Sequence, residues 1–318
     1  MKKVLVTGGA GFIGSHLSER LRREDVNVVV LDNFDPFYEP ALKRRNLRHL
    51  EKDSGFRLVE GDIRDEDLVN GLFARERFDT VFHLAARAGV RPSLEEPRLY
   101  QDVNVVGTVT LLEAARVHEV GCFVFGSSSS VYGNNKKVPF AEDDPVDHPI
   151  SPYAASKKAG ELVAYTYHHL YGLDISCLRF FTVYGPRQRP EMAIHKFTRL
   201  ISQGRPVPRF GGGGTVRDYT YIDDIIDGVM AAAEKSRGYR IYNLGESLTT
   251  PLSRLIELIE ETVGRKADVR EEPAQPGDVE CTYADVTRAR GELGYAPSVP
   301  VEQGIPRFVE WYRREVQE

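Results

Sequence analysis

The stretch VLVTGGAGFIG at residues 4–14 decides the fold of this chain. Residues 4–6 are an apolar run that ends at a threonine and two glycines, which predicts a short buried strand. Helical spacing follows directly, because Ile13, Leu17 and Leu21 fall on one face of a helix. A strand that turns through glycines into a helix presents backbone amides and the positive end of a helix dipole. This arrangement predicts a site for a phosphate group.

Three glycines and one aspartate indicate which phosphate compound binds. Gly8, Gly11 and Gly14 have the spacing GxxGxxG rather than the GxGxxG of other dinucleotide-binding loops. Asp32 ends a second apolar run about 20 residues further on, where an acid accepts hydrogen bonds from the adenosine ribose. An acid there also repels a 2′-phosphate, so the sequence predicts NAD as the cofactor rather than NADP. Asp62 ends a third strand and either meets the adenine amino group or is a turn residue.

Strands and helices alternate through the first part of the chain. Apolar runs predict strands at 26–31, 56–59, 80–84, 122–125 and 175–180, and helical spacing predicts helices at 103–117 and 152–170. This alternation predicts an α/β fold, a Rossmann doubly wound parallel sheet with right-handed crossovers.

The character of the sequence changes after residue 180, where prolines and glycines cluster. Later in the chain we expect helices at 251–263 and near 301–314, with a loop at 271–277. We therefore expect an NAD-binding Rossmann domain at 1–180 and a smaller substrate lobe at 181–318. Some segments of that lobe are expected to return to the Rossmann domain.

Composition and charge exclude several classes of protein. The net charge of −5 over 318 residues argues against a broad nucleic-acid surface. Cys122, Cys177 and Cys281 are widely spaced and form no CxxC pair, so we expect neither a disulfide framework nor a metal site. Reduced core thiols in the cytoplasm are the simpler interpretation. No apolar stretch reaches membrane-spanning length, and the apolar run near Met1 is too short for a secretory signal.

The stretch SPYAASK at 151–157 is the sharpest chemical signal. Ser151 suits an N-cap and the next residue, a proline, suits the first helical position, so Tyr153 and Lys157 are expected on one helix face. A free tyrosine has a pKa near ~10, but a neighbouring ammonium, a helix N-terminus and a cationic nicotinamide all favour the phenolate. Ser128, at the end of a predicted strand, is placed to hydrogen-bond the reacting hydroxyl. We therefore predict that Tyr153 takes a proton from a sugar hydroxyl while a hydride leaves for NAD.

Together these residues resemble the extended short-chain dehydrogenase/reductase family of nucleotide-sugar epimerases and dehydratases. The resemblance covers essentially the whole chain, through the motifs TGGAGFIG at 7–14, HLAA at 83–86, SSSSVYG at 127–133, YAASK at 153–157, RDYTYIDD at 217–224 and NLG at 243–245. It implies catalytic roles for Ser128, Tyr153 and Lys157. It implies NAD contacts at Gly8, Gly11, Phe12, Ile13, Gly14, Asp32, Asn33, Asp62, Ile63, Leu84, Ala85, Ala86 and Lys157.

The same resemblance implies a site for a UDP-sugar. The implied substrate contacts are Arg91, Ser129, Ser130, Thr182, Arg189, Phe210, Arg217 and Asp278. Among them, Arg217 resembles a ligand of the diphosphate and Asp278 a ribose contact, and Phe210 lies where the base packs.

The residues after Ser128 discriminate between reactions within this family. Its 4,6-dehydratases carry an Asp-Glu pair there, and its UDP-glucuronate decarboxylases carry a Glu before the Val-Tyr. This chain has Ser129 and Ser130 and no acid, so elimination lacks its proton shuttle. Simple 4-epimerisation needs none, because the same hydride leaves C4 and returns to the other face of the ketone.

The stretch RFFTVYGPRQRP at 179–190 is similar to the UDP-glucuronate 4-epimerases of the family. Thr182 stands where epimerases of UDP-glucose usually have Asn, and with Arg189 it would hold the C6 carboxylate. Alternatively, Arg187 and Arg189 are diphosphate or surface arginines. The run of glycines at 211–214 departs from the usual Gly-Asp-Gly of the family and leaves the loop near the base open.

We therefore expect NAD-dependent 4-epimerisation of UDP-glucuronate to UDP-galacturonate by transient oxidation at C4. The alternatives are a 4-epimerase of neutral UDP-sugars, a UDP-sugar decarboxylase or dehydratase on the same scaffold, and a catalytically idle NAD-sensing scaffold. We further expect a cytoplasmic homodimer formed through the helices near 103–117 and 152–170, with no nucleic-acid or membrane partner.

Overall fold

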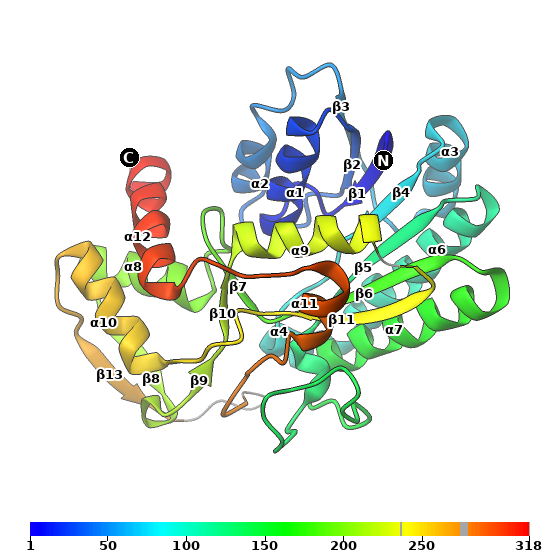
Figure 1. Cartoon of the computed structure of the whole chain (residues 1–318). Helices are drawn as coiled ribbons and strands as arrows, with labels where there is room; N and C mark the ends of the chain where they lie inside the picture. The colour runs from blue at the N-terminus through cyan, green and yellow to red at the C-terminus, as the bar shows by residue number, and fades with distance from the viewer. Residues whose placement is uncertain (236, 274–278, 318) are drawn as a thin grey trace.

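A computed structural model describes residues 1–235, 237–273 and 279–317. Its centre is a seven-stranded sheet in which every neighbouring pair is parallel, in the order β11-β6-β5-β4-β1-β2-β3 (Figure 1). The strands are β1 Lys3–Thr7, β2 Asn27–Asp32, β3 Phe56–Glu60, β4 Thr80–His83, β5 Cys122–Ser128, β6 Asp174–Phe180 and β11 Tyr239–Leu244. The predicted Rossmann doubly wound sheet is therefore confirmed.

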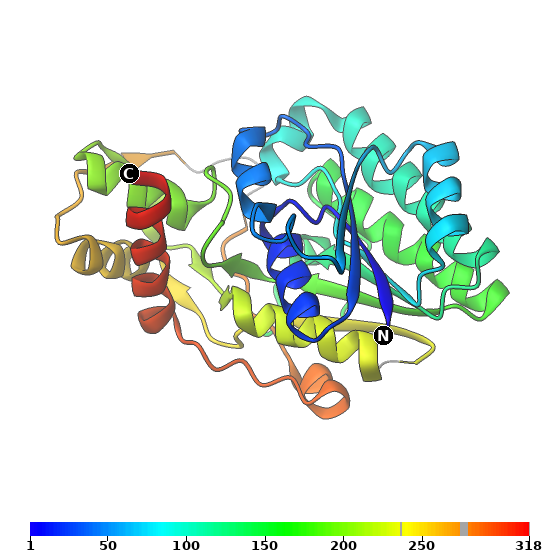
Figure 2. The ribbon, with the colours of Figure 1, turned by 90° about the horizontal axis from the view of Figure 1, so that it is seen from above.

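Helices cover both faces of this sheet, because alternate strand residues point to opposite sides. In β1, Val4 and Val6 join the core beneath α1 (Phe12–Arg23) and α9 (Ile222–Lys235), whereas Leu5 joins the core beneath the helices of the other face. Those helices are α3 Glu66–Glu76, α6 Gly107–Val117 and α7 Pro152–Tyr171. Figure 2 shows the two helical layers from above, with the sheet between them.

The strand order reverses at β1, and this reversal places the site. The chain runs from β1 outward through β2 to β3, then returns to β4 on the other side of β1. Loops leaving the carboxyl ends of β1 and β4 therefore diverge and leave a crevice between them. A shorter helix, α2 Pro40–Leu47, lies between β2 and β3, and two more, α4 Val90–Glu95 and α5 Pro97–Gln101, lie between β4 and β5.

A smaller lobe stands beside the carboxyl edge of the sheet (Figures 1 and 2). Its helices are α8 Ala193–Gln203, α10 Leu252–Val263 and α12 Val301–Tyr312. Its strands form three pairs: β7 Thr182–Tyr184 with β10 Tyr219–Tyr221, β9 Val216–Arg217 with β12 Thr250–Pro251, and β8 Val207–Phe210 with β13 Val269–Glu272. Two elements from this half of the sequence, α9 and β11, lie on and in the large sheet, and α11 Thr287–Leu293 packs against them.

Several predicted bounds differ from those of the structure. Residues 271 and 272, expected in a loop, end strand β13, because they pair with Arg209 and Phe210. The helix expected from residue 103 starts as a π-helical turn at Asp102–Val106 before α6 begins. The last long helix, expected to end near 314, passes after Tyr312 into a π-helical turn that runs to Gln317. No helix in the described part of the chain is long and apolar enough to cross a membrane.

Candidate active site

One cavity of about 400 Å³ opens at the carboxyl ends of β1, β2, β4 and β5. Its lining residues are far apart in the sequence, because they run from Gly8 in the Rossmann half to Met192 in the lobe. The predicted cofactor, catalytic and substrate residues that line it are Gly8, Gly11, Phe12, Ile13, Gly14, Asp32, Asn33, Asp62, Ile63, Leu84, Ala85, Ala86, Ser128, Ser129, Ser130, Tyr153, Lys157, Thr182 and Arg189. Four predicted residues are not among the lining: Arg91, Phe210 and Arg217 lie elsewhere, and Asp278 is outside the described residues.

The glycine loop leaves room that no side chain would leave. A Cβ on Gly8, whose φ is +67°, would lie 2.8 Å from the Cα of Ala85, and one on Gly14 would lie 2.3 Å from the Gly8 carbonyl oxygen. Gly11 starts α1 with no side-chain cap, so the first amides of the helix keep their hydrogen-bonding capacity. A bare loop at a helix N-terminus fits the diphosphate of a dinucleotide.

Two carboxylates lie beside this loop. Asp32 accepts hydrogen bonds from the backbone N–H groups of Ala10 (3.0 Å) and Phe34 (2.9 Å), and burial raises its pKa. This anchoring holds Asp32 at the end of β2, in the position that fits an adenosine ribose. Asp62 also lines the cavity, but both of its oxygens accept hydrogen bonds from Arg64, at 2.9 and 2.7 Å.

The start of α7 delivers the tyrosine and the lysine. Ser151 caps the helix by accepting a hydrogen bond from the Ala154 N–H (3.1 Å), and a proline occupies its first turn, as predicted. Tyr153 and Lys157 then face the cavity one turn apart. The Lys157 ammonium donates to the Gly126 carbonyl oxygen at 2.7 Å.

Burial dominates the electrostatics of these two side chains. It raises the pKa of Tyr153, against a hydrogen bond with Ser128 and the positive charge of Arg189. It lowers the pKa of Lys157 to about 8, against the negative charge of Glu161. Both shifts favour the neutral forms, so the site needs a further positive charge near the phenol to make it a base.

The serine-rich turn completes this side of the cavity. Ser128 ends β5, and its Oγ donates to the Ser130 Oγ at 3.1 Å while it accepts from the Ser130 backbone N–H at 3.1 Å. A short 3₁₀ turn, Ser129–Tyr132, follows and places Ser129 and Ser130 on the cavity wall beside Ser128. The acidic residues of the lining, Asp32, Asp35 and Asp62, lie at or just after the ends of β2 and β3, on the far side of β1 from this turn.

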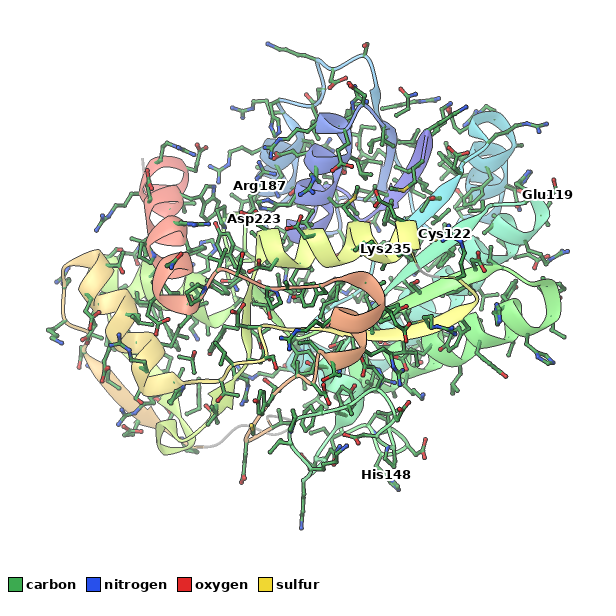
Figure 3. The ribbon with its side chains drawn as sticks, viewed as in Figure 1. Glu119, Cys122, His148, Arg187, Asp223 and Lys235 are labelled. Carbon is green, nitrogen blue, oxygen red and sulfur yellow. The ribbon has the colours of Figure 1, made fainter. Side chains whose placement is uncertain are left out.

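Arg189 and Arg187 stand two residues apart but have different surroundings. Arg189 lines the cavity, its Nε lies 3.0 Å from the carboxylate of Glu191, and its guanidinium lies 5.7 Å from the centre of the Phe37 ring. Arg187 instead pairs with Glu19 of α1. Figure 3 shows Arg187 beside α1. Its side chain therefore ties the loop after β7 to the Rossmann half and is not part of the cavity wall.

Sequence reasoning missed the segment that follows β2. Phe37, Tyr38 and Lys43 line the cavity, and Arg87 lies over the Phe37 ring at 5.0 Å. The Tyr38 hydroxyl is buried and has no hydrogen-bond partner among the described residues. Only the position of this segment directly after Asp32, at the carboxyl end of a strand, could have pointed to it.

The remaining predicted substrate residues lie in or beside the lobe. Arg91 of α4 lies 5.3 Å from the centre of the Phe210 ring, which brings the Rossmann half against β8. The guanidinium of Arg217 donates to the carbonyl oxygens of Val216 (3.0 Å) and Glu280 (3.1 Å). Among the described residues there is no group of three or more His, Cys, Asp and Glu side chains placed to hold a metal ion.

Comparison with known proteins identifies related sequences over nearly the full length. The family model for GDP-mannose 4,6 dehydratase matches residues 5–308. UDP-glucuronate 4-epimerase 5 of Arabidopsis thaliana is 47% identical over 327 residues, which cover 97% of this chain and 75% of that protein. UDP-glucuronate 4-epimerase of Thermodesulfobacterium geofontis is 43% identical over 315 residues, which cover 98% of this chain and 97% of that protein.

A solved structure of a related protein has closely similar backbone geometry. The crystal structure of UDP-glucuronic acid 4-epimerase from Bacillus cereus, in complex with UDP-glucuronic acid and NAD, superposes with a TM-score of 0.94. It is 36% identical in sequence, and the match covers 98% of this chain and 99% of that one.

Proposed function

Because the chain belongs to the GDP-mannose 4,6-dehydratase-like family of short-chain dehydrogenases/reductases, we propose that it catalyses the NAD-dependent 4-epimerisation of UDP-glucuronate to UDP-galacturonate. One observation carries the proposal. A single cavity holds Ser128, Tyr153 and Lys157 together with Thr182 and Arg189, and among the described residues that line it the acidic ones all lie on the β2 and β3 side, away from Ser128. The resemblance stated from the sequence is confirmed by the relatives and by the fold.

The reaction needs a proton acceptor at one hydroxyl and a hydride acceptor at the same carbon. Bound NAD supplies the hydride acceptor and brings a positive nicotinamide ring into the cavity. Ser128 orients the C4 hydroxyl and Tyr153 takes its proton, and Lys157 stabilises the phenolate from one helical turn away. Tyr153 returns the proton when the hydride comes back to the opposite face of C4, so atoms and charge balance over the cycle.

The described cavity wall beside Ser128 presents no acid to a substrate, and this separates the reaction from elimination. Removal of the 6-hydroxyl or its equivalent needs a side chain that shuttles a proton to the leaving group. Ser129 and Ser130 occupy the cavity wall there, and their hydroxyls are too weakly acidic to act in this way.

A C6 carboxylate on the sugar needs basic and hydroxyl side chains as hydrogen-bond donors, and the cavity wall provides both. We assign it to Arg189 and Thr182, with help from Ser129 and Ser130. A guanidinium matches a carboxylate through two parallel hydrogen bonds. This hold also opposes loss of CO₂ from the β-keto acid that forms when C4 is oxidised.

The rest of the UDP-sugar extends toward the lobe. We propose that Arg91 and Arg217 hold the diphosphate, that Phe210 packs against the uracil, and that Asp278 contacts the ribose. The Arg91–Phe210 stack supports this path, because it joins α4 of the Rossmann half to β8 of the lobe. The division into a Rossmann domain at 1–180 and a substrate lobe at 181–318 belongs to the same proposal.

Product analysis tests the function directly. Purified protein is incubated with UDP-glucuronate and, separately, with UDP-glucose, and the sugars are separated and identified. We expect UDP-galacturonate from the first and little conversion of the second. Equal conversion of UDP-glucose would favour an epimerase of neutral sugars, a pentose or deoxy-sugar product would favour decarboxylation or dehydration, and no turnover would favour an idle NAD-binding scaffold.

We also propose a cytoplasmic homodimer. Apolar side chains on α6 and α7 are exposed, among them Val109, Val117, Leu162, Tyr165, Leu170 and Tyr171. These two helices pack side by side on one face of the sheet. Two such pairs brought together would bury this surface in a four-helix contact.

A further inference from the structure

A carboxylate lies completely buried on the catalytic helix. Glu161 follows Tyr153 and Lys157 at the same four-residue interval on α7, and its exposed fraction is 0%. A buried charge strongly destabilises the folded state unless it is paired and hydrogen-bonded. Nothing in the proposed reaction uses Glu161, so its presence in the core calls for another explanation.

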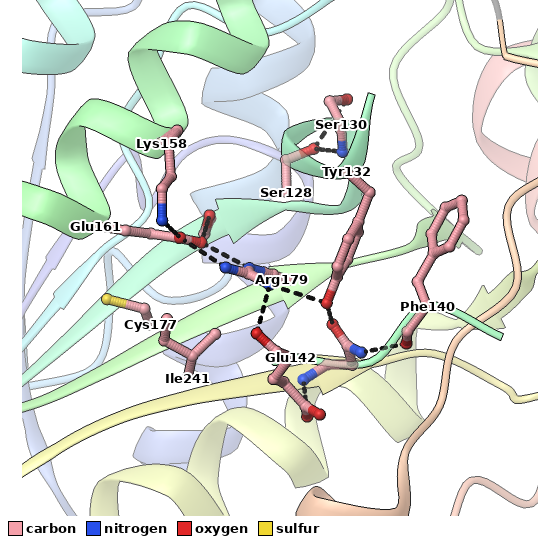
Figure 4. A network of polar contacts seen from close by, with 12 residues as sticks. Ser128, Ser130, Tyr132, Phe140, Glu142, Lys158, Glu161, Cys177, Arg179 and Ile241 are labelled. Atoms are coloured by element: carbon pink, nitrogen blue, oxygen red, sulfur yellow. Dashed lines mark hydrogen bonds and ion pairs between the residues drawn. The ribbon is translucent and has the colours of Figure 1, made fainter. Parts of the chain in front are cut away.

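Arg179 of β6 pairs with Glu161 through two hydrogen bonds (Figure 4). The Arg179 Nε donates to Glu161 Oε1 and its Nη2 to Oε2, each at 2.9 Å, and Arg179 itself is only 1% exposed. The Ser127 hydroxyl donates to Glu161 Oε1 at 2.7 Å. Since Ser127 precedes the catalytic Ser128 in β5, Glu161 is bonded directly to the strand end that presents the serine.

The same arginine reaches the far edge of the sheet. Ser127, Arg179 and Asn243 are register partners on the neighbouring strands β5, β6 and β11. Arg179 Nη1 donates to the Tyr132 hydroxyl at 2.9 Å, and that hydroxyl donates to the Asn243 Oδ1 at 2.7 Å. Figure 4 shows this chain of contacts running from α7 to β11. The network therefore leaves Glu161 little freedom to move.

Glu161 lies one helical turn from Lys157, and its negative charge acts to raise the pKa of that lysine. Its own ion pairs are with Arg179 and, at 3.5 Å, with Lys158. Burial acts to raise the pKa of Glu161, but the hydrogen bonds and charge of Arg179, with Ser127, bring the pKa below its usual value. Glu161 is therefore ionised. The other groups that face Lys157 are Tyr153 on α7, the Gly126 carbonyl on β5 and His83 on β4, whose pKa burial lowers to about 3. At neutral pH none of these three carries a negative charge.

We propose that Glu161, locked in place by Arg179, is a positioning residue of the catalytic apparatus. It fixes Ser127 beneath Ser128, and it places a permanent negative charge one helical turn from Lys157 that keeps the ammonium protonated. A purely structural ion pair would do neither. The expected change in kcat rests on the proposed function, whereas the expected change in the Lys157 titration does not.

The test separates the charge of Glu161 from its contribution to folding. Glu161→Gln removes the charge but leaves Arg179 buried without its partner, so it is expected to lower Tm as well as activity. The double variant Glu161→Gln with Arg179→Met removes both charges and is expected to regain much of the native Tm. Glu257→Gln, at an exposed position on α10, is the matched control.

Two readouts are compared across these variants. The first is the Lys157 titration in protein without substrate, followed by NMR of carbon-13-labelled lysine and assigned with Lys157→Met. The second is the pH profile of kcat for UDP-glucuronate. In the native protein we expect a Lys157 pKa of about 8. In Glu161→Gln the pKa and the alkaline limb of kcat should fall by about one pH unit, because a nearby opposite charge is lost. In the double variant the fall should be smaller, because loss of the Arg179 charge acts in the opposite direction.

The two variants together decide between the explanations. A Lys157 pKa that is lowered in Glu161→Gln, with a double variant of near-native Tm, supports the proposal. A native Lys157 pKa in Glu161→Gln would overturn it, because the pair would then serve folding alone. If the native protein does not turn over UDP-glucuronate, the proposed function fails while the titration still decides the role of Glu161.

Discussion

Tyr153 and Lys157 lie in surroundings that oppose their own ionisation. Burial raises the pKa of the phenol and lowers that of the ammonium, so the protein alone does not produce a ready base. The nicotinamide ring adds to the positive charge that Arg189 already places near the phenol. This dependence has a chemical advantage, since the base forms only when the hydride acceptor is present.

Replacing Tyr153 with Phe removes one hydroxyl and preserves the ring that fills the cavity wall. We expect turnover of UDP-glucuronate to fall roughly 10²–10⁴-fold, because no other well-placed base stands beside Lys157. The fold and bound NAD should be retained, as checked by circular dichroism and by NAD released on denaturation. Tyr165→Phe, at an exposed position on the same helix, should behave as native. Near-native turnover in Tyr153→Phe would remove this residue from the mechanism.

Arg189→Ala tests the carboxylate site. Loss of a charged partner should cost on the order of 2–4 kcal/mol in binding or transition-state energy, so epimerisation of UDP-glucuronate should fall sharply. A larger share of turnovers should end in a decarboxylated 4-keto-pentose, which product analysis by mass spectrometry detects. Conversion of UDP-glucose, already poor, should change little.

Arg187→Ala is the control for that experiment. This arginine has the same charge and lies two residues away, but it pairs with Glu19 on α1. It should retain the native product distribution even if Tm falls. The assignment of Arg189 fails if its alanine variant handles UDP-glucuronate as the native enzyme does.

At the scale of elements, the glycine loop and the start of α1 form one unit. Backbone atoms pack so closely around the glycines of this loop that an added methyl group would force the loop to change conformation. In Gly14→Ala the new Cβ would meet the Gly8 carbonyl oxygen at 2.3 Å and the Gly9 Cα at 2.7 Å. Backbone atoms cannot give way as the end of a flexible side chain does.

We therefore expect Gly14→Ala to lose NAD during purification, as measured by the cofactor content of the isolated protein. Gly71→Ala is the matched control, because Gly71 lies within α3 and has nothing within 4 Å of an added Cβ. There the change should keep NAD and stabilise the protein by about 0.5–1 kcal/mol, from the higher helix propensity of alanine. Full cofactor content in Gly14→Ala would contradict the assignment of this loop.

At the scale of the whole molecule, most of the large apolar side chains that are exposed in the described part of the chain lie on two adjacent helices. Leu162, Leu170 and Tyr171 of α7 are 56%, 65% and 53% exposed, and Val117 of α6 is 51% exposed. A surface of this kind on one layer of the sheet favours self-association over a monomer.

Sedimentation equilibrium at micromolar concentration should give twice the chain mass of 35.8 kDa. Leu162→Glu should shift the protein toward monomer, because a charge at the centre of the contact loses its water. Leu248→Glu, equally exposed but outside α6 and α7, should leave the dimer intact. A native protein of monomeric mass would exclude this arrangement.

The sequence by itself determined those features that depend on a single helix, strand or turn. The strand, loop and helix of residues 4–14, the cap at Ser151, and the one-turn separation of Tyr153 and Lys157 are all local. They depend on backbone preferences and helix periodicity, which act over a few residues. The alternation of strands and helices also predicted the sheet, because parallel strands need crossovers of this length.

Only the tertiary structure decided which distant residues share a site. Arg187 and Arg189 look alike in the sequence, and the fold turns one to α1 and the other to the cavity. The predicted ligand Arg217 lies outside the cavity lining, whereas the unpredicted Phe37 is within it. Such contacts join positions that can be 170 residues apart, as His16 and Pro186 are. They depend on how whole layers pack, which no local pattern encodes, and this is why the buried Glu161–Arg179 pair became visible only in three dimensions.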